Sequence, residues 1–245
     1  MPKRDLPAVA VSARPGVESR ISEKVQARWN PDVRAAGDDG DGARTISILD
    51  PIGESFWFDG VTAKRIAASL RAIDGKDVVV NINSPGGDFF EGLAIYNLLR
   101  EYEGEVTVRI LGLAASAASV IAMAGDTVQI GRAAFLMIHN TWVVAAGDRH
   151  ALREAADWLE PFDASAVSVY AARTGLDGKA LEKMCDDESW IGGEKAVDQG
   201  FADDLLDSDA VENSAKNSKE LSPMAAETKL DLALGTGVQL PRTAR

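Results

Sequence analysis

The sequence predicts an α/β domain with a mostly parallel sheet. Short apolar runs alternate along the middle of the chain with longer segments in which apolar residues recur at helical spacing. Repeated β-α-β-α units of this kind are typical of folds in which helices cover parallel strands. With 245 residues, 46% of them hydrophobic, the chain is long enough to bury one sizeable core.

The strands are recognised as short runs of β-branched and apolar residues bounded by turn residues. Thr45–Leu49 ends at Asp50-Pro51, and Val78–Ile82 is apolar enough for a buried parallel strand. The predicted strands are residues 45–49, 78–82, 106–111, 127–130 and 134–138.

The helices are recognised by apolar residues three or four positions apart and by the glycines that end them. Ile66, Leu70 and Ile73 occupy one face of a helix that Gly75 ends. Pro161 is expected to kink or split the last helix. The predicted helices are residues 66–73, 93–99, 114–124 and 150–172.

The two ends of the chain differ in composition from the middle. Residues 1–43 are polar and contain several prolines and an Asp/Gly run, which predicts a flexible lead-in. Residues 44–207 form the predicted folded domain. Residues 208–245 are predicted to be a polar linker followed by a short amphipathic piece at 225–234.

The net charge, the apolar runs and the cysteine content together indicate which partners and which cellular location to expect. A net charge of −12 and a pI near 4.7 disfavour nucleic acids and anionic membrane surfaces, which bind basic faces. No apolar run approaches the ~20 residues that span a bilayer. Cys185 is the only cysteine, so no intramolecular disulfide can form. We therefore expect a cytoplasmic protein without nucleic-acid or membrane partners.

Ser116 and His139 are the candidate nucleophile and base. Ser116 follows Gly112-Leu-Ala-Ala at a predicted strand-to-helix junction, where free backbone N–H groups can stabilise negative charge. His139 ends the apolar run that begins at Phe135, whereas His150 lies in a charged stretch. Taken singly, each residue also has a structural interpretation: a serine in a packed small-residue helix, and a histidine satisfied by hydrogen bonds.

Two further segments could complete a hydrolytic site. The paired glycines of Ser84–Gly87 follow a strand and expose backbone N–H groups that an oxyanion site requires, although a simple β-turn has the same pattern. Asp186–Trp190 supplies carboxylates that could orient an imidazole, although an acidic cluster is also typical of a solvated face.

Taken together, the order and spacing of these segments resemble the Clp protease proteolytic subunit family. The resemblance covers residues 45–207, most of the chain. It rests on Asn81–Gly87, Gly112–Ser116, Met137–His139 and Glu194–Gly200. Within the family, the sequence is similar to the ClpP-like head maturation proteases of tailed phages and prophages, on Trp29–Pro31, Trp57, Val61–Ile66, Glu188–Trp190 and Lys229–Leu234.

The resemblance implies a ClpP/crotonase-like spiral of ββα units with a strand-plus-helix handle inserted between base and acid. It implies Ser116 as nucleophile, His139 as base and Glu188 as the acid that orients His139. Asp187 is the alternative acid. The backbone N–H groups of Gly87 and Ala117 are expected to form the oxyanion hole, and no metal or organic cofactor is required.

The function implied is that of a serine endopeptidase acting through an acyl-enzyme at Ser116. Its substrates would be polypeptides, with capsid or scaffold proteins as candidates, and its location the host cytoplasm or the procapsid. The handle implies a homo-oligomeric ring. An ATPase unfoldase partner is not implied, because the lead-in does not resemble the segment that housekeeping subunits present to their ATPase. Two alternatives remain open: a non-proteolytic scaffold or adaptor ring, and a crotonase-type acyl-CoA enzyme.

Overall fold

The computed structural model describes residues 17–18, 21–31, 44–55 and 58–206. The strands are β1 (Val17–Glu18), β2 (Thr45–Ile48), β3 (Glu54–Ser55), β4 (Phe58–Asp59), β5 (Val78–Ser84), β6 (Val106–Ala115), β7 (Thr127–Ile130), β8 (Phe135–Ile138), β9 (Val144–Ala145), β10 (Ser189–Gly192) and β11 (Asp204–Leu205). The helices are α1 (Glu23–Gln26), α2 (Ala63–Ile73), α3 (Phe89–Arg100), α4 (Ala117–Ala122), α5 (Arg149–Thr174), α6 (Gly178–Asp186) and α7 (Gly193–Asp198).

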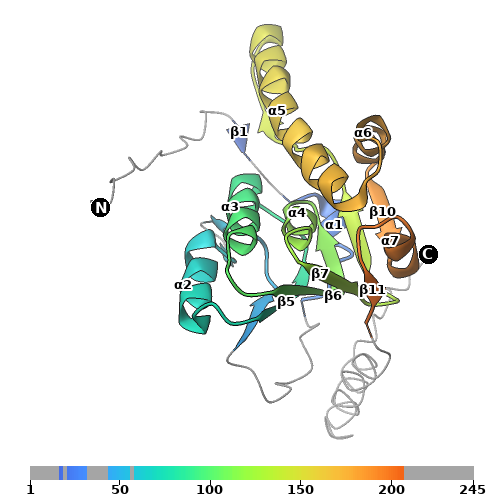
Figure 1. Ribbon diagram of the computed structural model, residues 1–245. Helices are drawn as coiled ribbons and strands as arrows, with labels where there is room; N and C mark the ends of the chain where they lie inside the picture. The colour runs from blue at the N-terminus through green and yellow to red at the C-terminus, as the bar shows by residue number, and fades with distance from the viewer. Residues whose placement is uncertain (1–16, 19–20, 32–43, 56–57, 207–245) are drawn as a thin grey trace, which may run out of the picture. The chain divides into compact units, whose positions relative to one another are not determined.

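A seven-stranded sheet organises the domain (Figure 1). Its main path runs in the order β10-β8-β6-β5-β2, in which β2, β5, β6 and β8 are parallel and β10 is antiparallel to β8. The long strand β6 changes partner along its length: residues 107–110 pair with β7, and residues 113–115 pair with β8. The sheet therefore branches at the end of β6, next to Ser116.

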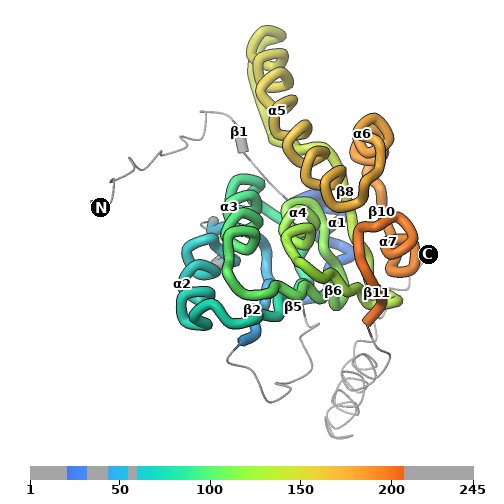
Figure 2. The backbone as a smooth tube through the Cα atoms, in the orientation of Figure 1, coloured from blue at the N-terminus to red at the C-terminus, as the bar shows by residue number. Residues whose placement is uncertain are grey.

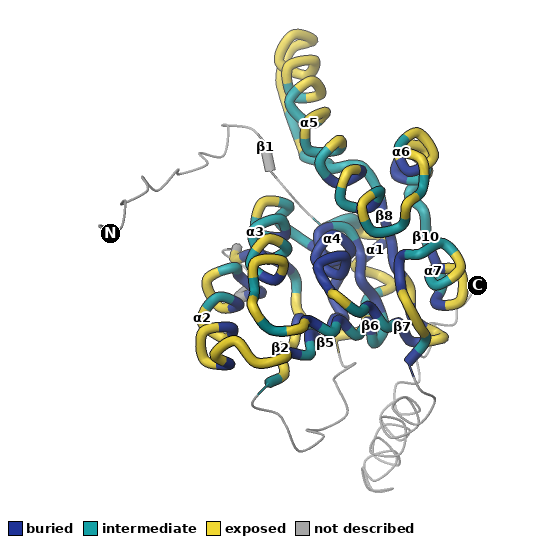
Figure 3. Tube along the Cα trace, in the orientation of Figure 1, coloured by how far each residue is buried: buried dark blue, intermediate teal, exposed yellow. Residues whose placement is uncertain are grey.

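Most of the core lies between the sheet and the helices that follow its strands. Helix α4 is buried along its whole length, as Figure 3 shows in dark blue. Four of its six residues are alanine or serine, so it can approach the sheet and neighbouring helices closely. Helix α2 presents Ile66, Leu70 and Ile73 to the core and is followed by Asp74, which has the left-handed backbone common at helix C-termini.

The predicted α/β fold with parallel strands is confirmed, but two predicted helices differ from those observed. The small-residue helix begins at Ala117 and not at Ala114, because β6 continues through Ala115 to pair with β8. Pro161 does not split α5, which runs without interruption from Arg149 to Thr174. Pro161 is exposed, so water can hydrate the carbonyl that its missing N–H leaves without a donor.

Strand β9 and helix α5 form the strand-plus-helix handle. Figures 1 and 2 show α5 extending away from the sheet, and Figure 3 shows its outer turns exposed. The helix packs on the domain through its last turns, where Ala166, Val167 and Tyr170 are buried. Further out, Trp158 contacts Phe90 of α3, and residues 149–154 at the start of α5 are exposed.

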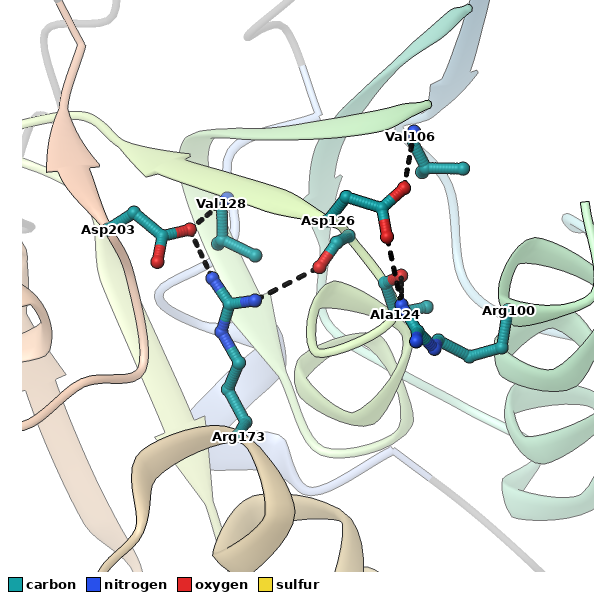
Figure 4. A network of polar contacts seen from close by, with 8 residues as sticks. Arg100, Val106, Ala124, Asp126, Val128, Arg173 and Asp203 are labelled. Atoms are coloured by element: carbon teal, nitrogen blue, oxygen red, sulfur yellow. Dashed lines mark hydrogen bonds and ion pairs between the residues drawn. The ribbon is translucent and has the colours of Figure 1, made fainter. Parts of the chain in front are cut away.

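Arg173 ties the base of the handle to the sheet through Asp203 (Figure 4). Arg173 donates to the carbonyl of Gly125 at 3.0 Å and forms an ion pair with Asp203. Asp203 also accepts the backbone N–H of Val128 at 2.7 Å. Arg173 therefore joins the end of α5 to the β7 region of the sheet.

Part of the predicted lead-in packs on the domain. Residues 23–26 form α1, and Val25 is only 1% exposed. Residues 1–16, 19–20, 32–43 and 207–245 lie outside the described residues. The division into a lead-in, a domain and a tail therefore stays a prediction, with residues 21–31 packed on the domain.

Candidate active site

Ser116 lies at a tight turn between the end of β6 and the start of α4. Its backbone has φ 54° and ψ −125°, a conformation uncommon for residues other than glycine. The N–H of Ser116 donates to the carbonyl of Met137 at 2.9 Å, which ties this turn to β8. A strained strand-to-helix turn of this kind presents a serine hydroxyl at the edge of a sheet.

His139 directly follows β8 and meets Ser116. Its Nε2 atom lies 2.8 Å from Oγ of Ser116, within hydrogen-bonding distance. Burial lowers the pKa of His139 below its ordinary value, and this effect outweighs the nearby carboxylates that raise it. The imidazole is therefore neutral at neutral pH and able to accept a proton from the serine.

Glu188 is placed beside His139 by the pairing of β10 with β8. Ser189, the first residue of β10, pairs with Ile138, so Glu188 and His139 each lie one residue beyond this pair. The negative charge of Glu188 raises the pKa of His139, against the effect of burial. The carboxylate is held by Trp190, whose Nε1 donates to Oε1 at 3.5 Å, and by Lys24, whose Nζ lies 3.5 Å from the same oxygen.

The other acidic residues of this segment have different partners. Asp187, the alternative acid, is exposed and forms an ion pair with Lys183 at 2.8 Å. Asp186 accepts a hydrogen bond from Nδ2 of Asn140 at 2.7 Å. Among residues 186–188, Glu188 is therefore the carboxylate whose charge acts on His139.

Asp163, a carboxylate outside the predicted site, lies near the same histidine. It is on α5 and accepts both the N–H and the hydroxyl of Thr141, each at 2.6 Å. Its charge, like that of Glu188, raises the pKa of His139. No sequence motif marks Asp163, because its place beside His139 depends on the orientation in which α5 packs over the strand ends.

The turn Ser84–Gly87 lies against the nucleophile. Gly86 has φ 85°, and a Cβ on it would lie 2.8 Å from Cβ of Ser116 and 2.5 Å from the carbonyl oxygen of Ala115. The carbonyl of Gly86 accepts the N–H of Ile52 at 2.8 Å, which fixes the turn. Glycine is therefore required at position 86 for the turn to approach Ser116.

The two predicted oxyanion donors have free N–H groups. Within the described part of the chain, neither the N–H of Gly87 nor that of Ala117 donates to another protein group. Gly87 belongs to the turn beside Ser116, and Ala117 is the next residue along the chain from it. Both N–H groups are therefore available to an oxyanion.

Other reactive groups are less suited to this chemistry. Cys185 is buried, and burial raises the pKa of its thiol to about 12, so it is a poor nucleophile. In the residues that the structure describes, no group of three or more His, Cys, Asp or Glu side chains could hold a metal ion.

Of the helices described, none is both long and apolar enough to cross a bilayer.

The site brings together groups that nucleophilic catalysis by a serine uses: a hydroxyl within hydrogen-bonding distance of an imidazole, a carboxylate whose charge acts on the imidazole, and two free N–H groups. The family model described as Clp protease matches residues 43–209, two thirds of the sequence. The chain belongs to the Clp protease family.

Curated relatives and a solved structure agree with this assignment. The ATP-dependent Clp protease proteolytic subunit 1 of Prochlorococcus marinus is 29% identical over 168 residues, covering 66% of this chain and 85% of the relative. The proteolytic subunit of Ligilactobacillus salivarius is 31% identical over 152 residues, covering 59% and 76%. The structure of a ClpP1 mutant from Listeria monocytogenes matches with a TM-score of 0.58 at 21% identity, covering 69% and 94%. The predicted ClpP-like fold is confirmed.

Proposed function

We propose that the protein is a serine endopeptidase in which Ser116, His139 and Glu188 form the catalytic triad. The observation that carries the proposal is the 2.8 Å contact between Nε2 of His139 and Oγ of Ser116, at a turn with two free N–H groups. Membership of a protease family supports the same reaction class. Asp187, paired with Lys183, is the less suitable acid.

In the proposed reaction, His139 takes the hydroxyl proton of Ser116 while Oγ attacks the carbonyl carbon of the peptide bond. The oxyanion accepts hydrogen bonds from Gly87 and Ala117, each worth about 3 kcal/mol in sites of this kind. Glu188 stabilises the imidazolium, which then gives its proton to the leaving amine. Water, activated by His139, hydrolyses the acyl-enzyme and regenerates Ser116.

Labelling with a fluorophosphonate tests this function directly. We expect the wild-type protein to gain the mass of one phosphonyl group on Ser116, because only a serine activated by a base reacts readily. Intact mass spectrometry followed by peptide mapping measures the adduct. Ser69→Ala, which removes an exposed serine, is the matched control and should label normally.

Two results would argue against the proposal. A folded protein that does not label favours a scaffold ring or a crotonase-type acyl-CoA enzyme, neither of which needs an activated serine. Adduct formation that persists in Ser116→Ala places the nucleophile elsewhere.

The biological role that we propose is maturation of phage or prophage heads, with capsid or scaffold proteins as substrates. Support comes from the sequence itself: Trp29-Asn-Pro31 and Glu188-Ser-Trp190 are similar to that branch of the family. The acidic composition and the single cysteine agree with action in a bacterial cytoplasm or procapsid. We propose no ATPase partner.

We also propose that the handle assembles the protein into a homo-oligomeric ring. Leu152 and Val144 are 46% and 44% exposed on the outer part of the handle, where an apolar side chain gains by packing against another subunit. Light scattering at micromolar concentration should give a mass several times 26.0 kDa. Leu152→Gln should weaken the assembly, whereas Arg153→Gln, its exposed neighbour, should not. A 26 kDa monomer that cleaves peptides would contradict the assembly.

A further inference from the structure

The segment Ile21–Asn30 contacts all four strands that adjoin the catalytic groups, which are β5, β6, β8 and β10. We propose that this segment, here called the N-terminal brace, positions the catalytic groups, with Trp29 and Lys24 as its main positioning residues. The inference rests on the proposed serine peptidase function. The brace precedes residues 43–209, the part of the chain that matches the family model, so it is an addition to that part.

The apolar contacts of the brace lie on the second face of the sheet. Ala114 belongs to the main core, whereas its neighbours Leu113 and Ala115 belong to a separate cluster with Met137 and Val25. Successive residues of a strand point to opposite faces, so this cluster lies on the face of β6 and β8 away from the main core. Ala115 directly precedes Ser116, and the carbonyl of Met137 accepts the N–H of Ser116. The brace therefore packs directly beneath the nucleophile.

Two hydrogen bonds tie the brace to the strand that carries the oxyanion turn. Nε1 of Trp29 donates to the carbonyl of Asn83 at 2.9 Å, and Nδ2 of Asn83 donates to the carbonyl of Asn30 at 2.8 Å. Asn83 is buried and directly precedes Ser84, where the oxyanion turn begins. A displacement of Trp29 would therefore also displace the backbone of Asn83, which lies only four residues before Gly87.

Two more contacts reach the acid. Lys24 pairs with Glu188 at 3.5 Å, and the guanidinium of Arg28 lies 5.0 Å from the ring centre of Trp190. The side chain of Glu188 is 28% exposed, and β10 pairs only with β8 among the described strands. The brace thus limits the movement of an acid that lies on an edge strand.

The physical reason for a positioning role is the number of separate elements in the site. The oxyanion turn, nucleophile, base and acid follow or precede four different strands, β5, β6, β8 and β10. Displacements of about 1 Å in such a site cost on the order of 10²-fold in rate. One segment that contacts all four strands reduces their independent movement.

The first test compares Trp29→Phe with Gln26→Ala in the full-length protein. Trp29→Phe keeps an aromatic ring against the apolar cluster but is smaller and removes the N–H donor to Asn83, so we expect kcat for a fluorogenic peptide to fall on the order of tenfold, with KM little changed. Gln26→Ala changes an exposed residue of α1 and should have no effect. The rate of fluorophosphonate labelling should fall in parallel with kcat.

The second test uses Lys24, whose replacement leaves the buried cluster intact. The charged groups around His139 are Glu188 and Asp163, with Lys24 next to Glu188 and Asp186 beyond Asn140. Lys24→Met removes a positive charge, so the pKa of His139 should rise. The acid limb of kcat/KM should then move to higher pH by a few tenths of a unit, and Lys24→Arg should restore it.

The outcomes separate the brace from the function on which it rests. Absence of wild-type labelling overturns the peptidase proposal itself. A wild-type protein that labels, together with unchanged kcat in Trp29→Phe and an unchanged acid limb in Lys24→Met, overturns the brace alone. A fall in thermal stability with kcat unchanged also overturns it, since the segment would then be only structural.

Discussion

Ser116→Ala and His139→Ala are each expected to lower peptide hydrolysis by on the order of 10⁴-fold, because nucleophile and base act as a unit. Without the hydroxyl there is no acyl-enzyme, and without the imidazole nothing 2.8 Å from that hydroxyl can take its proton. Steady-state kinetics on a fluorogenic peptide measure the effect. The double variant should lose little more activity than either single variant.

His150→Ala is the matched control for the histidine variant. His150 is the other histidine of the chain and is exposed in the first turn of α5, so its removal should leave kcat unchanged. Turnover retained by purified Ser116→Ala would contradict the assignment of the nucleophile. Circular dichroism should show both inactive variants folded.

The second large effect is expected at Glu188. Glu188→Gln keeps the size of the side chain but removes the charge that stabilises the imidazolium, so kcat should fall on the order of 10⁴-fold. The pKa of His139 should also fall, because a neighbouring negative charge that raises it is lost. The acid limb of the pH–rate profile should therefore move to lower pH.

Asp187→Asn is the matched control for this prediction, since Asp187 is adjacent, exposed and paired with Lys183. It should retain full activity. If instead Asp187→Asn is inactive and Glu188→Gln is active, Asp187 is the acid. If both variants are active, Asp163 on α5 is the remaining carboxylate whose charge acts on His139.

The parts of the molecule that follow from local pattern were predictable. Strand β5 begins with the apolar run Val78–Val80 and α2 has a clear apolar stripe, so short windows of sequence define both. The approach of Ser116 to His139 also follows, because parallel neighbours β6 and β8 end at the same edge of the sheet.

The features that were missed depend on tertiary packing. Ala114 and Ala115 have high helix propensity, but pairing with β8 keeps them in β6. Asp163 comes near His139 only because of the orientation of α5. The brace was predicted to be flexible, because a polar, proline-containing segment shows too little apolar periodicity for its one buried valine, Val25, to stand out.

The strained backbone of Ser116 has a consequence for the evolution of this protein. A non-glycine residue in such a conformation costs about 1–3 kcal/mol, against a total folding stability of about 5–15 kcal/mol for a typical domain. Glycine would adopt the same backbone with less strain and would remove the nucleophile. Stability and turnover therefore oppose each other at position 116. A lineage selected only for a durable fold would lose this serine early, so only selection for chemistry would keep it.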